Sequence, residues 1–470
     1  MYSLTFTLKQ HTPLIHFQHE QAGATLRASE VKPKLDRFIL AHCETTIAKI
    51  CQDAFEKEKE QYKSSLEFLA TCEASFANEW GDLVEDAKND GYFDEHLERT
   101  WKNIIFSRFS QEKYRQFEEK TKESFFVGDT QALDYKMRIE INPEDLEPHY
   151  LFDSFFSKAK VSLLEREGYQ VLPKAPYFAD SKVIGDREYD KAKQGLMLAE
   201  GRFAKVEIFS FNTILLEIVK DAFPKLLALE NFGTRQSKGF GGFTVHNIVG
   251  EKYNMTKDKY EEYLKIKHGG RVLYYTFNET GTDLTDVFKE ITERYQILKS
   301  GFLKESSVLA TYYKSRKKIE WEKTLVKAVL IDARGAAKGN DYSTDDKNKY
   351  IRAFLGFAEL YEYPRKEDGQ SKVKVRHLVK DENGKIDLGE NGTFSEGEIK
   401  RFRSPITIKV FYDMKSKKYT IYLLIGEVPE KMYDKTFQLS REKDEYILIN
   451  TPKDKVDLMD IVKLRGYKVL

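Results

Sequence analysis

The same order of sequence patterns occurs twice along this chain of 470 residues. In each round, segments in which apolar and polar residues alternate are separated by amphipathic helical segments. In the first round, residues 4–8 (LTFTL) alternate with a period of two, which predicts a half-buried strand. A helix opened by Pro33 follows, because apolar residues then recur at helical spacing and proline is favoured in a first turn. The round is completed by strands at 135–141 and 204–211 and by a strongly apolar helix at 214–227.

The second round has the same order. It begins with a strand at 271–277 and a helix at 283–300. Two alternating strands, 406–412 and 419–425, are joined by DMKSKK, which predicts a hairpin. We therefore expect an α+β protein built of two ferredoxin-like modules, one in residues 1–250 and one in residues 251–470.

Charge is distributed unevenly along the sequence. The whole chain has a formal net charge of +1, yet residues 44–99 hold 15 acidic and 6 basic residues, a net of −9. The other residues therefore sum to +10 and are able to present a basic surface. Residues 55–130 keep a helical but charged pattern, so we expect a helical insertion in the first module, directed at solvent or at another protein.

The three cysteines, Cys43, Cys51 and Cys72, are too few for a disulfide framework. Cys43 and Cys51 share a helical pattern, so we expect them in a core rather than at a metal. No apolar run approaches the ~18 residues of a membrane span, and the first residues lack the layout of a signal peptide. These features predict a cytoplasmic protein with no membrane partner, no metal and no cofactor.

The segment 231–242 (NFGTRQSKGFGG) is the most specific feature of the sequence. Its glycines surround Arg235 and Lys238, and it contains no acidic residue. Glycines let a backbone approach a phosphate and offer its N–H groups, while Arg and Lys supply countercharge. The segment follows a helix and precedes a strand, which is the reverse of a dinucleotide fold, and it lacks a Walker lysine. A phosphate-binding loop and a glycine helix cap before a bulged strand are equal alternatives.

Residues 400–419 (KRFRSPITIKVFYDMKSKKY) carry seven basic residues and one acid. Alternation places Thr407, Lys409 and Phe411 on one face of the expected strand. A sheet face that mixes lysine with aromatic rings is able to stack bases and to neutralise phosphates. A solvated outer face beside a basic turn explains the pattern equally well.

Histidines offer the main argument for an enzyme. His11, His16 and His19 cluster beside the first strand, and a metal-independent ribonuclease uses such a side chain as a general base. No partner occurs at a diagnostic spacing, so we expect these histidines to polarise a loop or to pack under it.

Four segments resemble the RAMP superfamily of CRISPR-associated proteins, most of all the two-module Cmr-type (type III-B) effector subunit. They are the HTPL sequence at 11–14, TLRASEVKPKLDRFI at 25–39, GTRQSKGFGGF at 233–243 and RFRSPITIKV at 401–410. These anchors lie near the start, middle and end of the chain. Two features depart from the family: Lys32-Pro33-Lys34 replaces a Lys-Gly pair at the helix start, and the insertion has no counterpart that aligns.

The resemblance implies RRM-like RAMP modules that bind CRISPR RNA and target RNA beside other type III effector subunits. Phe240 and Phe243 would pack or stack near the bound RNA. Together with the basic pattern, the resemblance implies RNA contacts at Arg27, Lys32, Lys34, Arg37, Gly233, Arg235, Lys238, Gly239, Phe240, Gly241, Arg401, Arg403 and Lys409.

RAMP subunits that cut target RNA use an aspartate in the loop after the first strand. Residues 9–35 of this chain contain no aspartate, and the acids available are Glu20 and Glu30. We therefore expect a non-catalytic RNA-binding subunit that serves antiviral defence. Replacement of Arg235 and Lys238 by alanine is expected to weaken RNA binding and its salt dependence without unfolding the protein.

Two alternatives stay open. One is a metal-independent endoribonuclease that processes CRISPR RNA with His16 or His19. The other is a protein-interaction scaffold that is bound to its neighbours through the helical insertion.

Overall fold

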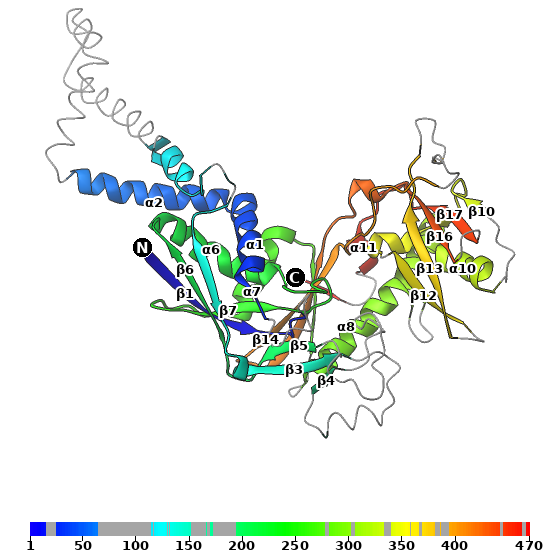
Figure 1. Cartoon of the computed structure of the whole chain (residues 1–470), viewed down its shortest axis with the longest axis horizontal. Helices are drawn as coiled ribbons and strands as arrows, with labels where there is room; N and C mark the ends of the chain where they lie inside the picture. Colours follow the sequence, from blue (N-terminus) through cyan, green and yellow to red (C-terminus); the bar gives the residue numbers. More distant parts are fainter. Residues whose placement is uncertain are drawn as a thin grey trace, which may run out of the picture.

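The structure is a computed structural model of the whole chain, shown in Figure 1. It describes the following residues: 1–15, 25–63, 114, 115, 117–128, 130, 132–151, 166, 170–172, 194–277, 282–301, 306–332, 340–357, 359–365, 369–380, 386, 394–441, 445–462 and 467–470. The histidines His16 and His19, Glu20, Cys72 and most of the expected insertion lie outside these residues.

The first sheet has the strand order β2–β6–β1–β7, and all its neighbouring strands are antiparallel. Helix α1 precedes β2 along the chain and α6 connects β6 to β7, and both helices pack on the sheet in one hydrophobic core. Phe6 of β1 meets Phe223 of α6 edge to face, with ring centroids 4.9 Å apart. The bounds are β1 Tyr2–Gln10, α1 Ala28–His42, α2 Glu44–Lys63, β2 Lys136–Glu140, β6 Ala204–Ser210, α6 Thr213–Leu229 and β7 Phe243–Ile248.

The second sheet has the order β14–β15–β8–β18, again antiparallel throughout. With β8 first in the sequence, this order repeats that of the first sheet. One face of the sheet packs on α8, and the opposite face packs on α6 and α7 in the core of the first sheet. The bounds are α7 Lys257–His268, β8 Val272–Thr276, α8 Leu284–Lys299, β14 Ile406–Asp413, β15 Lys418–Ile425, α11 Leu458–Val462 and β18 Lys468–Val469.

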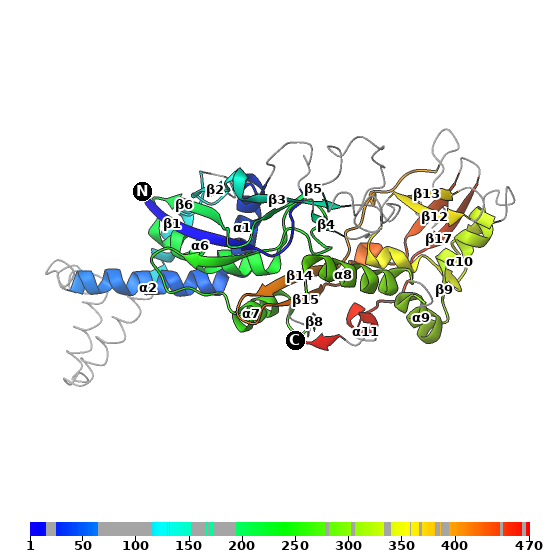
Figure 2. The same ribbon diagram turned by 90° about the horizontal axis from the view of Figure 1, so that it is seen from below.

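A five-stranded sheet that we did not expect from the sequence is inserted into the second half. Its order is β10–β17–β16–β13–β12, with only the β10–β17 pair parallel. Figures 1 and 2 show it on the opposite side of α8 from the first sheet. The bounds are α9 Val308–Tyr312, β9 Glu320–Trp321, α10 Glu322–Val326, β10 Asn340–Tyr342, β11 Asn348–Lys349, β12 Leu360–Arg365, β13 Gly369–His377, β16 Thr436–Ser440 and β17 Tyr446–Asn450.

A small three-stranded sheet, β4–β3–β5, lies beside the end of β1. It is formed by β3 Leu146–Leu151, β4 Gln170–Leu172 and β5 Gln194–Leu198. It is joined to the first sheet through Leu14, whose N–H donates to the carbonyl of Leu196 over 2.8 Å.

Most elements expected from periodicity are confirmed, including the strands β1, β2, β6 and β8, the helices α6 and α8, and the β14–β15 hairpin. Cys43 and Cys51 are buried in the core of the first sheet, as expected. The start of the first helix was wrong: α1 begins at Ala28 and Pro33 lies inside it. The α+β class with antiparallel sheets is correct, and the division of the chain at residue 250 stays a prediction.

Candidate nucleic-acid interface

The glycine-rich segment, residues 231–242, lies between α6 and β7. Its backbone is bonded to residues 11–15 at the end of β1: the N–H of Thr234 donates to the carbonyl of Ile15, and the N–H of Gly241 donates to that of Pro13. The N–H of His11 returns a bond to the carbonyl of Gly242 over 2.8 Å. The loop is therefore held along one side by the end of the first strand.

Two of the loop glycines are required by close contacts within the protein. A Cβ on Gly233 would overlap the carbonyl oxygen of Ile15, and a Cβ on Gly241 would overlap that of Phe232. Both glycines have positive φ, 77° and 70°, where a side chain is strained in any case. These contacts support the structural explanation of the glycines, in which they cap the helix and allow the turn.

An acidic side chain lies inside the loop, although the loop sequence has none. Glu30 of α1 accepts a hydrogen bond from the N–H of Gly233 over 2.7 Å and one from the side chain of Gln236 over 3.4 Å. Lys34, one turn along α1, lies 3.6 Å from Glu30 and donates to the carbonyl of Asn231 over 2.9 Å. The carboxylate occupies a backbone donor that an RNA phosphate would otherwise use.

The second half of the loop packs against α8. The ammonium group of Lys238 lies 3.1 Å from the centroid of the Tyr295 ring on α8. Burial, with the cations Lys299 and Arg235 nearby, lowers the pKa of Lys238 well below that of an ordinary lysine. Phe240 is 1% exposed and stacks on Phe288, with ring centroids 4.4 Å apart. Phe240 and Phe243 therefore have the packing role, and the expected RNA contact at Phe240 is wrong.

The expected basic face of β14 is also wrong. Lys409 is 1% exposed, and its ammonium group donates to the carbonyls of Leu227 and Glu230 at the end of α6, over 2.9 and 2.7 Å. Phe411 is equally buried and stacks on Tyr260 of α7. The face is covered because α6 and α7 pack on it, so Lys409 caps a helix C-terminus instead of meeting a phosphate.

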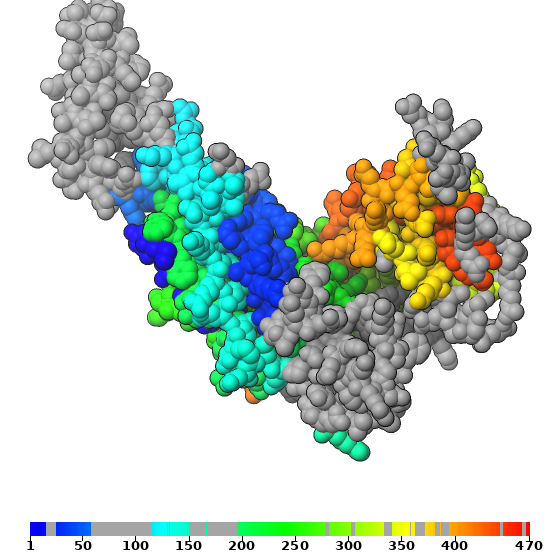
Figure 3. All heavy atoms as spheres, in the orientation of Figure 1, coloured from blue at the N-terminus to red at the C-terminus, as the bar shows by residue number. Residues whose placement is uncertain are grey.

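Cations from three separate parts of the chain lie around the loop, where Lys34 donates over 3.2 Å to Gln236, the residue that follows Arg235. Lys34 comes from α1, Arg235 from the loop and Arg403 from the segment before β14. Burial lowers the pKa of Lys34, Glu30 and Glu230 raise it, and Arg403 is close enough to lower it further. Figure 3 shows a notch between the blue surface of α1 and the orange surface near residue 400, with green atoms in its floor. We call Lys34, Arg235 and Arg403 the basic notch.

The other predicted contacts are dispersed. Arg27, Arg37 and Arg401 have exposed side chains. Arg37 donates to the carbonyl of Pro33 in its own helix. Lys32 points away from the loop, because its ammonium group binds Asp36 over 2.8 Å and the carbonyl of Leu133 over 3.0 Å. Gly239 has a φ of 90° and only ordinary contacts. The basic notch therefore contains only a few of the RNA contacts that were predicted from the sequence.

His11 is held in a structural role. Its Nδ1 accepts from the N–H of Tyr412 over 3.0 Å, and its Nε2 lies 2.8 Å from the hydroxyl of Thr244. It is 2% exposed, and burial lowers its pKa well below the usual range of a histidine. Both ring nitrogens are engaged, so His11 does not serve as a general base in this arrangement.

Sequence reasoning missed Glu30 as a loop ligand and Gln236 as a bridge between Lys34 and Gly233. The spacing of Glu30, Lys34 and Arg37 along one side of a helix could have indicated that these charged side chains act together. Nothing in the local sequence indicated that this side of the helix faces a loop 200 residues later.

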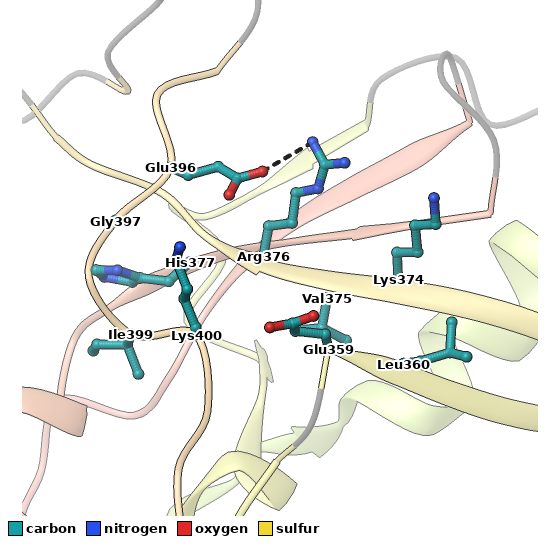
Figure 4. A pocket seen from close by; sticks show the side chains of 10 residues that line it. All are labelled: Glu359, Leu360, Lys374, Val375, Arg376, His377, Glu396, Gly397, Ile399 and Lys400. Carbon is teal, nitrogen blue, oxygen red and sulfur yellow. Dashed lines mark ion pairs between the residues drawn. The ribbon is translucent and has the colours of Figure 1, made fainter.

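A separate cavity of about 390 Å³ lies on the five-stranded sheet, and Figure 4 shows its lining. Arg376 and Glu396 form an ion pair across it at 3.2 Å. Lys374 and Lys400 add positive charge and Glu359 adds negative charge. Because its charges are largely balanced, this cavity is a weaker candidate for a polyanion than the basic notch.

Among the described residues, no group of three His, Cys, Asp or Glu side chains is placed to hold a metal ion. Within the same part of the chain, no helix is long and apolar enough to cross a membrane.

Family models match nearly the whole chain. Residues 1–78 and 90–302 match the model of the Cmr1 N-terminal domain, and residues 304–464 match that of the Cmr1 C-terminal domain. No curated protein sequence matches this chain.

Solved structures resemble it only distantly. The crystal structure of Cmr1 from Pyrococcus furiosus in its apo form is 11% identical, with a TM-score of 0.36, over 100% of this chain and 98% of that one. A chain in the cryo-EM structure of the type III-B Cmr-beta complex bound to cognate target RNA is 10% identical, with a TM-score of 0.39, over 98% of both chains. The assignment to a family therefore rests on the family models.

Proposed function

This chain belongs to the Cmr1 family, and from that premise we propose that it binds RNA without cutting it, as a subunit of a type III CRISPR effector complex. The RNA would be CRISPR RNA, target RNA or both, and the complex would act in antiviral defence. The membership confirms the resemblance to Cmr-type RAMP proteins.

We also propose that both halves of the chain are ferredoxin-like modules. The shared strand orders β2–β6–β1–β7 and β14–β15–β8–β18 support this, because each corresponds to second, third, first and fourth strand along its own half. The five-stranded sheet would then be an insertion in the second module.

The observation that carries the RNA-binding proposal is the basic notch. Lys34, Arg235 and Arg403 come from three segments that are far apart in sequence. Arg403 is close enough to Lys34 to lower its pKa, and Lys34 donates over 3.2 Å to Gln236, the residue that follows Arg235. Arg403 is exposed, so its guanidinium group is placed to meet a phosphate from solvent, and Arg235 is half-buried beside the loop backbone. Contacts of this kind position an RNA strand without reading its bases, and they weaken as the salt concentration rises.

Two observations support the absence of cleavage. The segment after β1 has no aspartate through residue 35, whereas target-cutting RAMP subunits use one there. His11, whose backbone is bonded to the loop, is buried and has both ring nitrogens bonded.

The test is a salt-titrated binding and cleavage assay of the full chain with labelled CRISPR RNA in EDTA. Arg235→Ala with Arg403→Ala removes two notch charges without disturbing the Lys238–Tyr295 contact. We expect weaker binding and a salt slope that falls by about 0.7 for each lost phosphate contact on a single strand. Lys49→Ala with Lys136→Ala is the matched control, because both lysines are exposed and lie outside the notch.

Equal losses in the two double variants would reject the notch as the RNA site. Cleavage in EDTA would replace the proposal with a metal-independent endoribonuclease. Absence of binding at low salt, in a folded protein that still binds effector subunits, would replace it with a protein scaffold.

A further inference from the structure

A cavity of about 440 Å³ lies where the end of β1, the small sheet, the start of α8 and the β14–β15 hairpin meet. Its volume is within the range of roughly 300–1,000 Å³ that small-molecule sites occupy. Neither the basic notch nor the proposed phosphate contacts use it. Its wall continues into the glycine-rich loop, because His11 lines the cavity and its N–H is bonded to Gly242.

Aromatic rings form one wall of this cavity. Tyr412 of β14 and Tyr419 of β15 both line it, with ring centroids 4.7 Å apart. Both tyrosines are half-buried, so their rings are not wholly covered by protein. The ammonium group of Lys9 lies 4.5 Å from the centroid of Tyr412. A planar ligand is able to stack on such rings, as single-stranded bases do on aromatic side chains.

A buried polar atom without a partner belongs to another lining residue of the cavity. His149 of β3 is 4% exposed and lines the cavity, and its Nδ1 has no hydrogen-bond partner in the described structure. Burial lowers its pKa to about 4, so the ring is neutral at pH 7 and is able to donate or accept. By contrast, the Gln10 side chain beside it is bonded to Thr12, Leu196 and Leu198. Buried polar atoms are normally paired, so the His149 ring has unused hydrogen-bonding capacity beside the cavity.

The charge of the lining favours a neutral ligand with amino groups over a phosphate. Glu200 and Asp283 line the cavity, and Asp283 also accepts from the N–H of Asp286 as the N-cap of α8. Of the two cations there, Lys9 lies over a ring and Arg202 is bound to Asp145 at 3.2 Å. Carboxylates repel a phosphate but accept hydrogen bonds from exocyclic amino groups.

We propose that this cavity holds one amino-bearing nucleobase of the bound RNA, unstacked from the strand and laid against Tyr412 and Tyr419. The inference rests on the proposed RNA-binding function and adds a base-holding site to the phosphate contacts of the notch. The base would lie beside His149, in the part of the cavity that the small sheet lines.

The experiment scans labelled CRISPR RNA and target RNA with single abasic nucleotides and measures the affinity of the full chain at fixed low salt. We expect one position at which loss of the base weakens binding about fivefold or more. Uracil at that position should bind more weakly than cytosine. Tyr412→Ala should lower the affinity for intact RNA by a similar factor and remove the effect of the abasic position.

Tyr412→Phe is the matched control, since it keeps the ring and should retain the effect. His149→Phe, which keeps the bulk but removes Nδ1, should reduce the preference for cytosine. Thermal unfolding reports whether each variant is folded. If Tyr412→Ala leaves the same abasic position sensitive, or if no position is sensitive, the cavity does not hold a base. The proposed function would still stand in that case if Arg235→Ala with Arg403→Ala weakens binding; absence of any RNA binding overturns both.

Discussion

The carboxylate of Glu30 accepts a hydrogen bond from the backbone N–H of Gly233 over 2.7 Å. The first helix thus places an acid in a loop whose own sequence contains only basic and neutral residues. The bond fixes the loop to α1, and the negative charge lies beside Lys34 and near the other cations of the notch. Glu30 therefore stabilises the loop and would oppose the proposed RNA binding.

Replacement of Glu30 by glutamine should separate these two effects. Glu30→Gln retains an oxygen that accepts from Gly233 but removes one negative charge from the notch. We expect RNA affinity to rise roughly two- to fivefold at low salt and the gain to shrink at high salt. Fluorescence anisotropy against salt measures both. Glu44→Gln, at an exposed position of α2, is the control; an equal gain there would mean that net charge alone is responsible.

The buried Lys409 predicts a dependence of stability on pH. Its pKa is lowered from 10.5 to about 7, chiefly by burial; Glu230 raises it and Lys34 lowers it. Between pH 7 and about 10 the unfolded chain binds more protons at this residue than the folded chain does. The free energy of unfolding should therefore rise with pH in this window, by up to about 1.4 kcal/mol per pH unit for this residue.

Urea unfolding at pH 7.5, 8.5 and 9.5 tests this dependence. Lys409→Met should reduce the rise, while Lys415→Met, at an exposed position of the hairpin turn, should leave it unchanged. Part of the rise should persist in Lys409→Met, because burial also lowers the pKa of Lys299 to about 7. The same slope in the wild type and in Lys409→Met would contradict the prediction.

Replacement of Gly241 by alanine should destabilise the loop by more than the strain at a positive φ alone would. Gly241 and Gly250 have similar φ values, 70° and 86°, but only at Gly241 would a Cβ overlap another atom, the carbonyl oxygen of Phe232. Gly250→Ala should cost about 1–2 kcal/mol from its conformation. Gly241→Ala should cost more and should weaken RNA binding. Thermal unfolding and anisotropy compare the two, and equal effects would show that the contact is unimportant.

The stability of the region around the five-stranded sheet should depend on one buried ion pair, between Glu322 and Arg352. Glu322 is fully buried and accepts from Arg352, from the N–H of Ile351 and from the indole of Trp321. Removal of its carboxylate leaves Arg352 charged and buried, so Glu322→Ala should cost about 3–5 kcal/mol of unfolding free energy.

The exposed pair between Arg376 and Glu396 provides the control for this prediction. Both side chains are about half exposed, at 48% and 52%, so Glu396→Ala should change stability by no more than about 1 kcal/mol. Urea unfolding gives both values. A loss at Glu322 as small as that at Glu396 would mean that water reaches the buried pair.

The local pattern of the sequence was sufficient to predict individual elements. Alternation at residues 4–8 predicts β1, apolar spacing at 214–227 predicts α6, and DMKSKK between two alternating segments predicts the β14–β15 hairpin. These elements follow from the sequence because a period of two or 3.6 residues determines which side chains share a face. The helical spacing of Cys43 and Cys51 likewise predicted their burial.

Only the tertiary structure decided which faces are covered. Lys409 alternates in sequence like an exposed strand residue, but it is buried because the end of α6, 179 residues away at Glu230, packs over it. Glu30 enters the glycine-rich loop through a contact across 203 residues. Periodicity reports the direction of a side chain relative to its own element and carries no information on the surface opposite. That surface is set by packing between distant segments, and the candidate RNA site depends on this packing.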